Sequence, residues 1–226
     1  MKKIISILMT SALLFCLAAC GGNVDNENTP ASAKQSGKQT AVPAEGQSNT
    51  GEPSEIPAPE SDPAEAGSKS LVAYFSWSGN TENVAEAIAE QTGSDIFEII
   101  PAMPYSDDYD TVVDLAQEEQ QNGARPEITG SIENISEYDV IYVGYPNWWG
   151  DMPMILYTFF DSYDLSGKTI APFCTSGGSG LSGTVSEIKE LEPSATVTDG
   201  LHIGSSSASN PDHAVSEWLS EIGLTK

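Results

Sequence analysis

Residues 71–81 decide the fold, and they read Leu71-Val72-Ala73-Tyr74-Phe75-Ser76-Trp77-Ser78-Gly79-Asn80-Thr81. An apolar run stops abruptly at hydroxyl residues and a glycine, and a helical pattern follows at once. The stretch therefore predicts a strand, a short loop and the first turn of a helix. Such a turn offers unpaired backbone N–H groups and the positive end of the helix dipole, which hold an anion without a cationic side chain. We therefore expect a phosphate-binding loop at 76–81, the first loop.

The residue types in the first loop suit a phosphate group. No Lys or Arg occurs between residues 70 and 81, so the binding groups must be backbone N–H groups and hydroxyls. Ser76, Ser78 and Thr81 can add hydroxyl donors, and Gly79 lets the backbone turn closely around the phosphate.

From residue 70 onward, short apolar runs alternate with amphipathic stretches. The apolar runs predict strands at 71–75, 95–100, 139–144, 169–175 and 196–203. The amphipathic stretches predict helices at about 81–92, 109–123, 153–162, 181–191 and 211–222. Nearly continuous apolar strands that alternate with helices are typical of an α/β domain with a doubly wound parallel sheet, covered by helices on both faces.

Ligands of a doubly wound sheet bind beyond the carboxyl ends of the strands, so the loops after the first, third and fourth strands should converge. The second loop (145–153) contains Pro146, Asn147, Trp148, Trp149 and Gly150, and the third loop (175–180) begins Thr175, Ser176, Gly177 and Gly178. A planar tricyclic ring needs an aromatic wall, backbone groups at its edge and small residues where the main chain approaches closely. The three loops together contain all of these features.

These motifs, in this order, resemble those of the short-chain flavodoxins. The resemblance rests on a Ser-x-Ser-Gly-Asn-Thr loop at 76–81 and a Pro-x-Trp-Trp-Gly loop at 146–150, and it covers about residues 70–224. It implies a flavodoxin-like sheet of five strands in the order 2-1-3-4-5, with FMN as cofactor. The implied cofactor-binding residues are Ser76, Trp77, Ser78, Gly79, Asn80, Thr81, Pro146, Asn147, Trp148, Trp149, Gly150, Thr175, Ser176, Gly177 and Gly178.

The resemblance also implies roles within the second loop. Trp148 or Trp149 would stack on the isoalloxazine ring, while Pro146 and Asn147 would shape its edge. The Gly150 peptide would reorient to hydrogen-bond the reduced flavin and so tune its redox steps. Many flavodoxins cover the other flavin face with an aromatic residue of the third loop, and this chain has none there.

Three functions follow from these expectations. The favoured one is an electron carrier that exchanges electrons with a redox partner protein, because the chain has no recognisable NAD(P)H domain. The second is a flavodoxin-like NAD(P)H:quinone oxidoreductase, or a reductase of another small acceptor, with no evident catalytic acid or base. The third is a binding module that keeps the fold without the flavin. A hydrolase is remote, because no Gly-x-Ser-x-Gly elbow is present and neither His202 nor His213 can be paired with a serine from sequence.

The N-terminal region reads as an export and anchoring segment. Lys2 and Lys3 precede an apolar run from Ile4 to Leu17, and small residues then lead to Cys20, as in a bacterial lipobox. We expect residues 1–19 to be a lipoprotein signal peptide and Cys20 to carry the lipid. Residues 20–69 form a Pro-, Ser- and Glu-rich tether, and residues 70–226 form the flavodoxin-like domain. The expected location is outside the cytoplasm, attached to the cell membrane through this lipid.

Charge and cysteine content restrict the remaining possibilities. Without Lys2 and Lys3, the mature chain has 7 basic and 33 acidic residues, a net charge of 7 − 33 = −26. This charge argues against nucleic acid as a partner and suits docking to basic proteins. Cys174 lies in an apolar run, so we expect a small buried side chain. Neither histidine has a Cys or His at ligand spacing, so we expect no metal site. Arg125, the only arginine, is expected in a structural ion pair.

Overall fold

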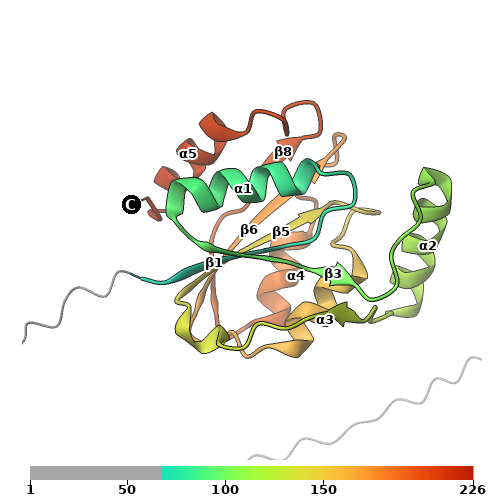
Figure 1. The fold of residues 1–226 in the computed structure, drawn as a ribbon, viewed down its shortest axis with the longest axis horizontal. Helices are drawn as coiled ribbons and strands as arrows, with labels where there is room; N and C mark the ends of the chain where they lie inside the picture. The colour runs from blue at the N-terminus through green and yellow to red at the C-terminus, as the bar shows by residue number, and fades with distance from the viewer. Residues whose placement is uncertain (1–67, 226) are drawn as a thin grey trace, which may run out of the picture. The chain divides into compact units, whose positions relative to one another are not determined.

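A parallel sheet forms the centre of the domain, which the computed structural model describes over residues 68–225 (Figure 1). Its strands are β1 (Ser70–Tyr74), β2 (Asp95–Glu98), β5 (Val140–Pro146), β6 (Thr169–Ser176), β7 (Thr196–Val197) and β8 (Leu201–Gly204). The order is β2-β1-β5-β6-β7, β8 also pairs with β6, and every pair is parallel. With β7 and β8 counted as one interrupted strand, this is the predicted order 2-1-3-4-5, and the predicted α/β fold class is confirmed.

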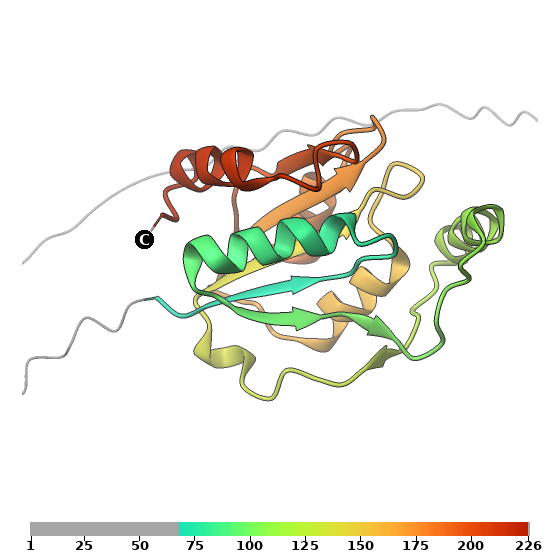
Figure 2. The same cartoon turned by 45° about the horizontal axis from the view of Figure 1, so that its top comes forward.

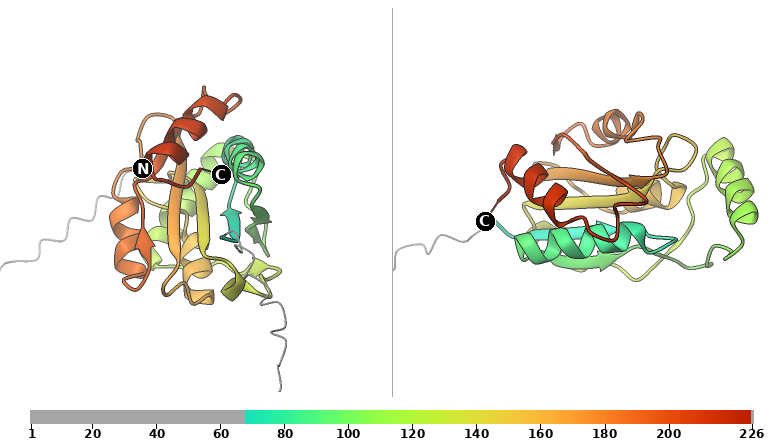
Figure 3. Two further views of the ribbon diagram at one scale, coloured as in Figure 1. Left: turned by 90° about the vertical axis from the view of Figure 1, so that its left-hand side faces the viewer. Right: turned by 90° about the horizontal axis from the view of Figure 1, so that it is seen from above.

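Of the five helices in residues 68–225, four cover the two faces of this sheet. The helices are α1 (Asn80–Thr92), α2 (Tyr109–Asn122), α3 (Met154–Ser162), α4 (Thr184–Leu191) and α5 (Asp212–Glu221), with a short 3-10 turn η1 (Ile135–Glu137) before β5. Figures 1 and 3 show α1 and α5 on one face and α3 and α4 on the other.

The core follows the alternation of side chains along each strand. In β1, Val72 and Tyr74 belong to the cluster that includes Val84 and Ile88 of α1. Leu71 and Ala73 belong to the cluster on the opposite face, with residues of α3. Because successive side chains of a strand point to opposite faces, one short apolar run supplies both layers of the core.

The second and fifth predicted strands are interrupted in the structure. The chain predicted as one strand at 95–100 leaves the sheet after Glu98, and Ile100–Pro101 forms β3, which pairs antiparallel with β4 (Ile128–Thr129). The fifth strand is interrupted at 198–200, where Thr198 N–H still donates to Ile170 O at 3.0 Å. The sequence analysis missed the β3–β4 pair because a two-residue pairing leaves no periodic signal.

Helix α2 departs from the expected packing on a sheet face. The β3–β4 pair carries the chain away from the sheet, and α2 lies beyond the carboxyl ends of the strands (Figure 2). Val112 and Ala116 are the buried residues of this helix. Tyr105, just before α2, donates a hydrogen bond from its hydroxyl to Glu119 at 2.9 Å, and burial raises the pKa of both groups. The helix is therefore held to its own connecting segment rather than to the sheet.

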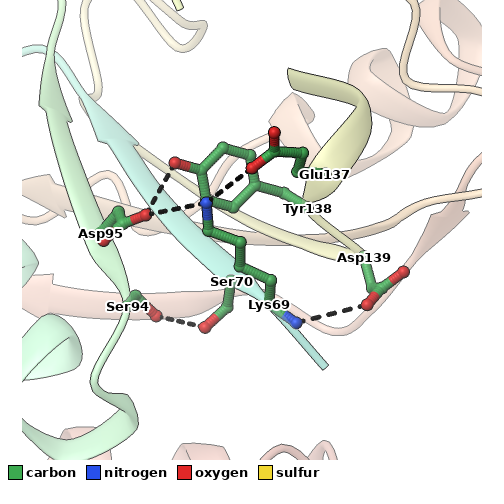
Figure 4. Close-up of polar contacts among 7 residues, drawn as sticks. All are labelled: Lys69, Ser70, Ser94, Asp95, Glu137, Tyr138 and Asp139. Atoms are coloured by element: carbon green, nitrogen blue, oxygen red, sulfur yellow. Dashed lines mark hydrogen bonds and ion pairs between the residues drawn. The ribbon is translucent and has the colours of Figure 1, made fainter. Parts of the chain in front are cut away.

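A polar network fixes the start of the domain (Figure 4). The Lys69 ammonium lies 3.0 Å from Glu137 and 3.5 Å from Asp95, and it sits 4.4 Å from the centroid of the Tyr138 ring. The hydrogen bond to Glu137 is the main reason that the pKa of Lys69 is raised, and a hydrogen bond from the Tyr138 hydroxyl lowers the pKa of Asp95. Since these charges are exposed, the network contributes little stability, but it fixes where the chain enters β1.

Two residues occupy the structural positions expected from sequence. Arg125 pairs with Asp161 and lies 5.1 Å from the centroid of the Tyr157 ring. Cys174 is buried in β6, and burial raises the pKa of its thiol to about 12. Both expectations are confirmed.

The expected signal peptide, the lipidated Cys20 and nearly all of the tether lie outside the described residues. Between residues 68 and 225, no helix combines the length and the apolar character needed to cross a membrane. Within the same range, no group of three or more His, Cys, Asp and Glu side chains is placed to hold a metal ion.

Candidate functional site

Three strands deliver the candidate site to one edge of the sheet. Strands β1, β5 and β6 are parallel neighbours, so the first, second and third loops all leave from their carboxyl ends. Direct bonds join the loops there. The Asn147 N–H donates to Thr175 O at 2.9 Å, and the hydroxyls of Thr81 and Thr175 are 2.8 Å apart. The convergence expected from sequence is therefore present.

The first loop leads into the start of α1 through a left-handed glycine. Gly79 has φ 83° in the left-handed region, and its N–H donates to the Ser76 hydroxyl at 3.1 Å. No described side chain caps the start of α1, so the backbone N–H groups of its first turn remain without a side-chain acceptor. The Ser78 side chain is exposed beside this turn. These features leave the start of α1 open to an anion, as a helix N-terminus can be.

Thr81 is buried, whereas a side chain that donates to a phosphate is expected at the surface of the loop. Its side chain is only 1% exposed, and its hydroxyl pairs with the hydroxyl of Thr175. A pair of hydroxyls shares one proton and keeps a second one free. The Thr81 side chain therefore links the first loop to the third, while its backbone N–H belongs to the open first turn of α1.

The second loop is a tight turn with a strained tip. Trp148 and Asp151 exchange backbone hydrogen bonds of 2.9 and 3.0 Å, and the two residues between them have positive φ angles, 54° at Trp149 and 82° at Gly150. Turns of this type favour glycine and asparagine, and a tryptophan in the left-handed region costs about 1–3 kcal/mol. Strain of this size persists only where neighbouring contacts hold the residue in place.

Two contacts hold this tip. The Trp149 indole N–H donates to Val113 O of α2 at 3.0 Å, and the Gly150 N–H donates to Asn147 Oδ1 at 3.0 Å. The Trp149 side chain is 52% exposed even so. Its ring is thus fixed at the surface of the site rather than packed in the core.

Trp148 and Trp149 take different positions. The Trp148 ring packs edge-on against Phe75 and Tyr105, with centroids 5.5 and 5.2 Å away. It is partly buried against the core, whereas Trp149 projects from the turn. From sequence, Trp148 and Trp149 were equivalent candidates for stacking on the ring. In the structure Trp148 is a packed wall and Trp149 is an exposed ring.

Asn147 joins the second and third loops. Its side-chain amide donates to Gly180 O at 3.0 Å and to the Ser182 hydroxyl at 2.9 Å, and its carbonyl accepts from Gly150. One side chain thus satisfies groups on both loops, which fixes their separation.

The third loop is organised by Ser176. Its hydroxyl oxygen accepts from Gly178 N at 3.3 Å and from Gly180 N at 3.1 Å, and it lies 2.8 Å from His202 Nε2. The sequence analysis found no serine partner for His202, and the register of β6 and β8 supplies one. A Cβ added at Gly177 or Gly178 would meet nothing within 4 Å, so the loop faces open space.

A cavity of about 530 Å³ lies among these loops, within the size range of small-molecule sites. Six of the expected residues line it, namely Trp77, Asn147, Trp148, Trp149, Gly177 and Gly178. Of the remaining expected residues, Ser76, Ser78, Gly79, Asn80 and Thr81 surround the start of α1, and Pro146, Gly150, Thr175 and Ser176 lie at the strand ends or turns beside the cavity.

The sequence analysis missed the wall that α2 contributes. Tyr109, Val112, Val113 and Ala116 line the cavity opposite the loops. Their i, i+3, i+4, i+7 spacing marks one helix face, and this signal is visible in the sequence. It was missed because the pattern shows that a helix has an apolar face and not what that face covers. The Trp77 indole N–H also donates to Ser106 O at 2.9 Å, just before α2.

A doubly wound parallel sheet with an uncapped helix start and a cavity at its carboxyl edge is an architecture that suits a phosphorylated cofactor. The chain belongs to the flavodoxin family, because the family model for flavodoxin matches residues 69–222.

Solved structures give the same assignment. The chain is 35% identical to a candidate flavoprotein from Bacteroides eggerthii, with a TM-score of 0.63, over 70% of this chain and 99% of that one. A second candidate flavoprotein, from Bacteroides uniformis, is 33% identical, with a TM-score of 0.62, over 68% and 99% of the two chains. A flavoprotein in complex with FMN from Lactobacillus acidophilus is 29% identical, with a TM-score of 0.55, over 67% and 99%. The comparison with curated proteins found no match.

The structure predicts that Asn147 holds the second and third loops together. Asn147→Ala should raise the hydrogen-exchange rates of amides in residues 176–182 and lower the free energy of unfolding by about 1–3 kcal/mol, because it removes partners of partly buried polar groups. Exchange measured by mass spectrometry, together with urea unfolding, checks both effects. Asn210→Ala, at an exposed position, is the matched control. Unchanged exchange in 176–182 would contradict the role.

Proposed function

We propose that this chain is an FMN-binding electron-transfer protein of the flavodoxin type. One observation carries the proposal. The uncapped start of α1 and the aromatic cavity share the first loop, so a phosphate at one and a flat ring in the other fit a single molecule. The Lactobacillus acidophilus relative in complex with FMN supports the choice of ring.

The residues present fit this cofactor. The backbone N–H groups of Ser78 and of residues 80–82, with the Ser76 and Ser78 hydroxyls, would hold the phosphate. The cavity walls from Trp77, Trp148 and Trp149 would hold the ring, and the third loop would present backbone N–H groups to its polar edge. FMN, when bound, supplies reversible uptake and release of electrons.

The chain's own part is to orient the ring, limit water access and set the local charge. Hydrogen bonds to Asn147 and to α2 hold the strained Trp149–Gly150 turn in place, so the flavin ring would contact a rigid wall. Lys69, Arg125, Lys168 and Lys189, the basic residues between 68 and 225, all lie outside the three loops. Acidic surroundings without a compensating cation disfavour the addition of electrons, so we expect a low reduction potential.

We prefer the electron carrier over the reductase. The third loop has no aromatic residue that would cover the second flavin face, and α2 contributes one wall of the cavity. The flavodoxin fold accounts for the whole of the described domain. The acidic character of the domain suits a basic redox partner protein. A reductase of a quinone or another small acceptor is the second candidate, since the exposed Tyr109 and Trp149 rings line the same cavity.

The phosphate site can be tested by placing a charge beside it. Ser78→Asp should raise the FMN dissociation constant at least about fivefold, because like charges about 5 Å apart repel by roughly 1–3 kcal/mol near a protein surface. Riboflavin, which lacks the phosphate, should be affected much less. Flavin fluorescence titration measures both constants.

Ser216→Asp on the exposed side of α5 is the control for net charge alone. Equal losses for FMN and riboflavin would place the phosphate elsewhere. No saturable flavin binding to the parent protein would leave only the flavin-free module.

The proposal includes a lipid anchor outside the cytoplasm. The support is the charged start, the apolar run and the Leu17-Ala18-Ala19-Cys20 sequence. Cys20→Ser should move the protein from the membrane fraction to the soluble fraction, or leave it as an unprocessed precursor, because no thiol remains to accept lipid. Fractionation with mass spectrometry of the N-terminus distinguishes these products. Unchanged membrane association with an unmodified Cys20 in the parent would contradict the anchor.

A further inference from the structure

The third loop depends on one hydroxyl. Ser176 is almost fully buried at the end of β6, and its oxygen accepts from the N–H groups of Gly178 and Gly180 while lying 2.8 Å from His202 Nε2. Strand β8 brings His202 to this point, because Cys174 and His202 are register partners and Ser176 follows on the same face of the sheet.

The hydrogen-bond count at this hydroxyl assigns its proton. A serine hydroxyl has two lone pairs and one proton. The two glycine N–H groups occupy both lone pairs, so the proton is donated to His202 Nε2. That nitrogen must then be unprotonated, and the ring proton of a neutral imidazole must lie on Nδ1.

Protonation of His202 removes this arrangement. A charged imidazole carries a proton on Nε2 as well, and that proton needs a lone pair of Ser176. A lone pair becomes free only if Gly178 or Gly180 gives up its bond. The charged histidine and the fully bonded third loop therefore exclude each other.

We propose that His202 is a positioning residue that holds the third loop in its cofactor-binding shape only when it is neutral, so that cofactor affinity falls as the pH is lowered. The inference rests on the proposed function, because it assigns the third loop to the FMN ring. His202 itself does not line the cavity and acts through Ser176.

The charged and ionisable side chains on the elements around His202 are these. On β6, Cys174 remains a neutral thiol, since burial raises its pKa to about 12. The segment between Ser176 and Gly183 contains no acidic or basic residue, and Asp199 precedes β8. Helix α4, which packs on β7, carries Glu187, Lys189 and Glu190, and helix α5, which packs on β8, carries Asp212, His213, Glu217 and Glu221. Within the described domain, none of these charges forms a hydrogen bond or ion pair with His202, so Ser176 is the contact through which its protonation acts.

The experiment measures two quantities at pH 8.0 and pH 5.5 on the full chain. The first is the FMN dissociation constant from flavin fluorescence. The second is the amide-exchange protection factor of Gly178 and Gly180 without FMN, from ¹⁵N NMR. The FMN phosphate also titrates in this range. The ratio of the FMN dissociation constants at pH 5.5 and pH 8.0 is therefore compared between each variant and the parent. The variants are His202→Gln, which keeps an acceptor without titrating, His202→Phe, which removes the acceptor, and His213→Gln on α5 as matched control.

The expected pattern differs for each variant. On acidification from pH 8.0 to pH 5.5, the FMN dissociation constant should rise about two- to tenfold more in the parent protein than in His202→Gln. This range corresponds to the loss of one hydrogen bond. His213→Gln should follow the parent. In His202→Phe, protection of Gly178 and Gly180 should be the same at both pH values, because no imidazole remains to donate to the lone pairs of Ser176. Equal pH ratios in the parent and His202→Gln, with protection independent of pH, would overturn the inference. If FMN fails to bind at any pH while protection still falls on acidification, the proposed function is wrong and the role of His202 in the loop stands.

Discussion

The parallel pairing of β1, β5 and β6 is the constraint on which the rest of the structure depends. The carboxyl ends of parallel neighbours lie at the same edge of the sheet, so three loops from distant parts of the chain meet there. The apolar runs bury both faces of these strands in the core. The loops are then free to carry residues that would be poor choices elsewhere, such as the tryptophan with positive φ at position 149.

The site is held by bonds between loops rather than by the sheet itself. Asn147 connects the second and third loops, the Thr81 and Thr175 hydroxyls connect the first and third, and the indoles of Trp77 and Trp149 connect to the α2 segment. Each loop therefore depends on its neighbours for its shape. Such an arrangement places backbone N–H groups and aromatic rings rigidly without any cation, which suits a cofactor whose charge must change during use.

The sequence predicted those parts of this design that depend on local signals. The strand, loop and helix start at residues 70–81 follow from an apolar run that meets hydroxyls and a glycine, and the structure places α1 one residue from the predicted start. The α2 wall was not predicted, since its apolar spacing reveals a face and not the partner of that face. The Ser176–His202 pair was also out of reach, because only the register of β6 and β8 brings the two residues together. The different positions of Trp148 and Trp149 depend on a turn conformation that adjacent tryptophans do not predict.

The central claim is that these three loops, with α2, form one FMN site. The most direct measurement is ¹⁵N NMR of the protein during titration with FMN. The account predicts saturable shift changes in residues 76–82, 146–151, 176–182 and 106–116, with little change around Lys69 and η1 at the opposite edge of the sheet. Saturable changes centred away from the carboxyl edge would place the site elsewhere, and no changes at millimolar FMN would contradict an FMN site in this protein.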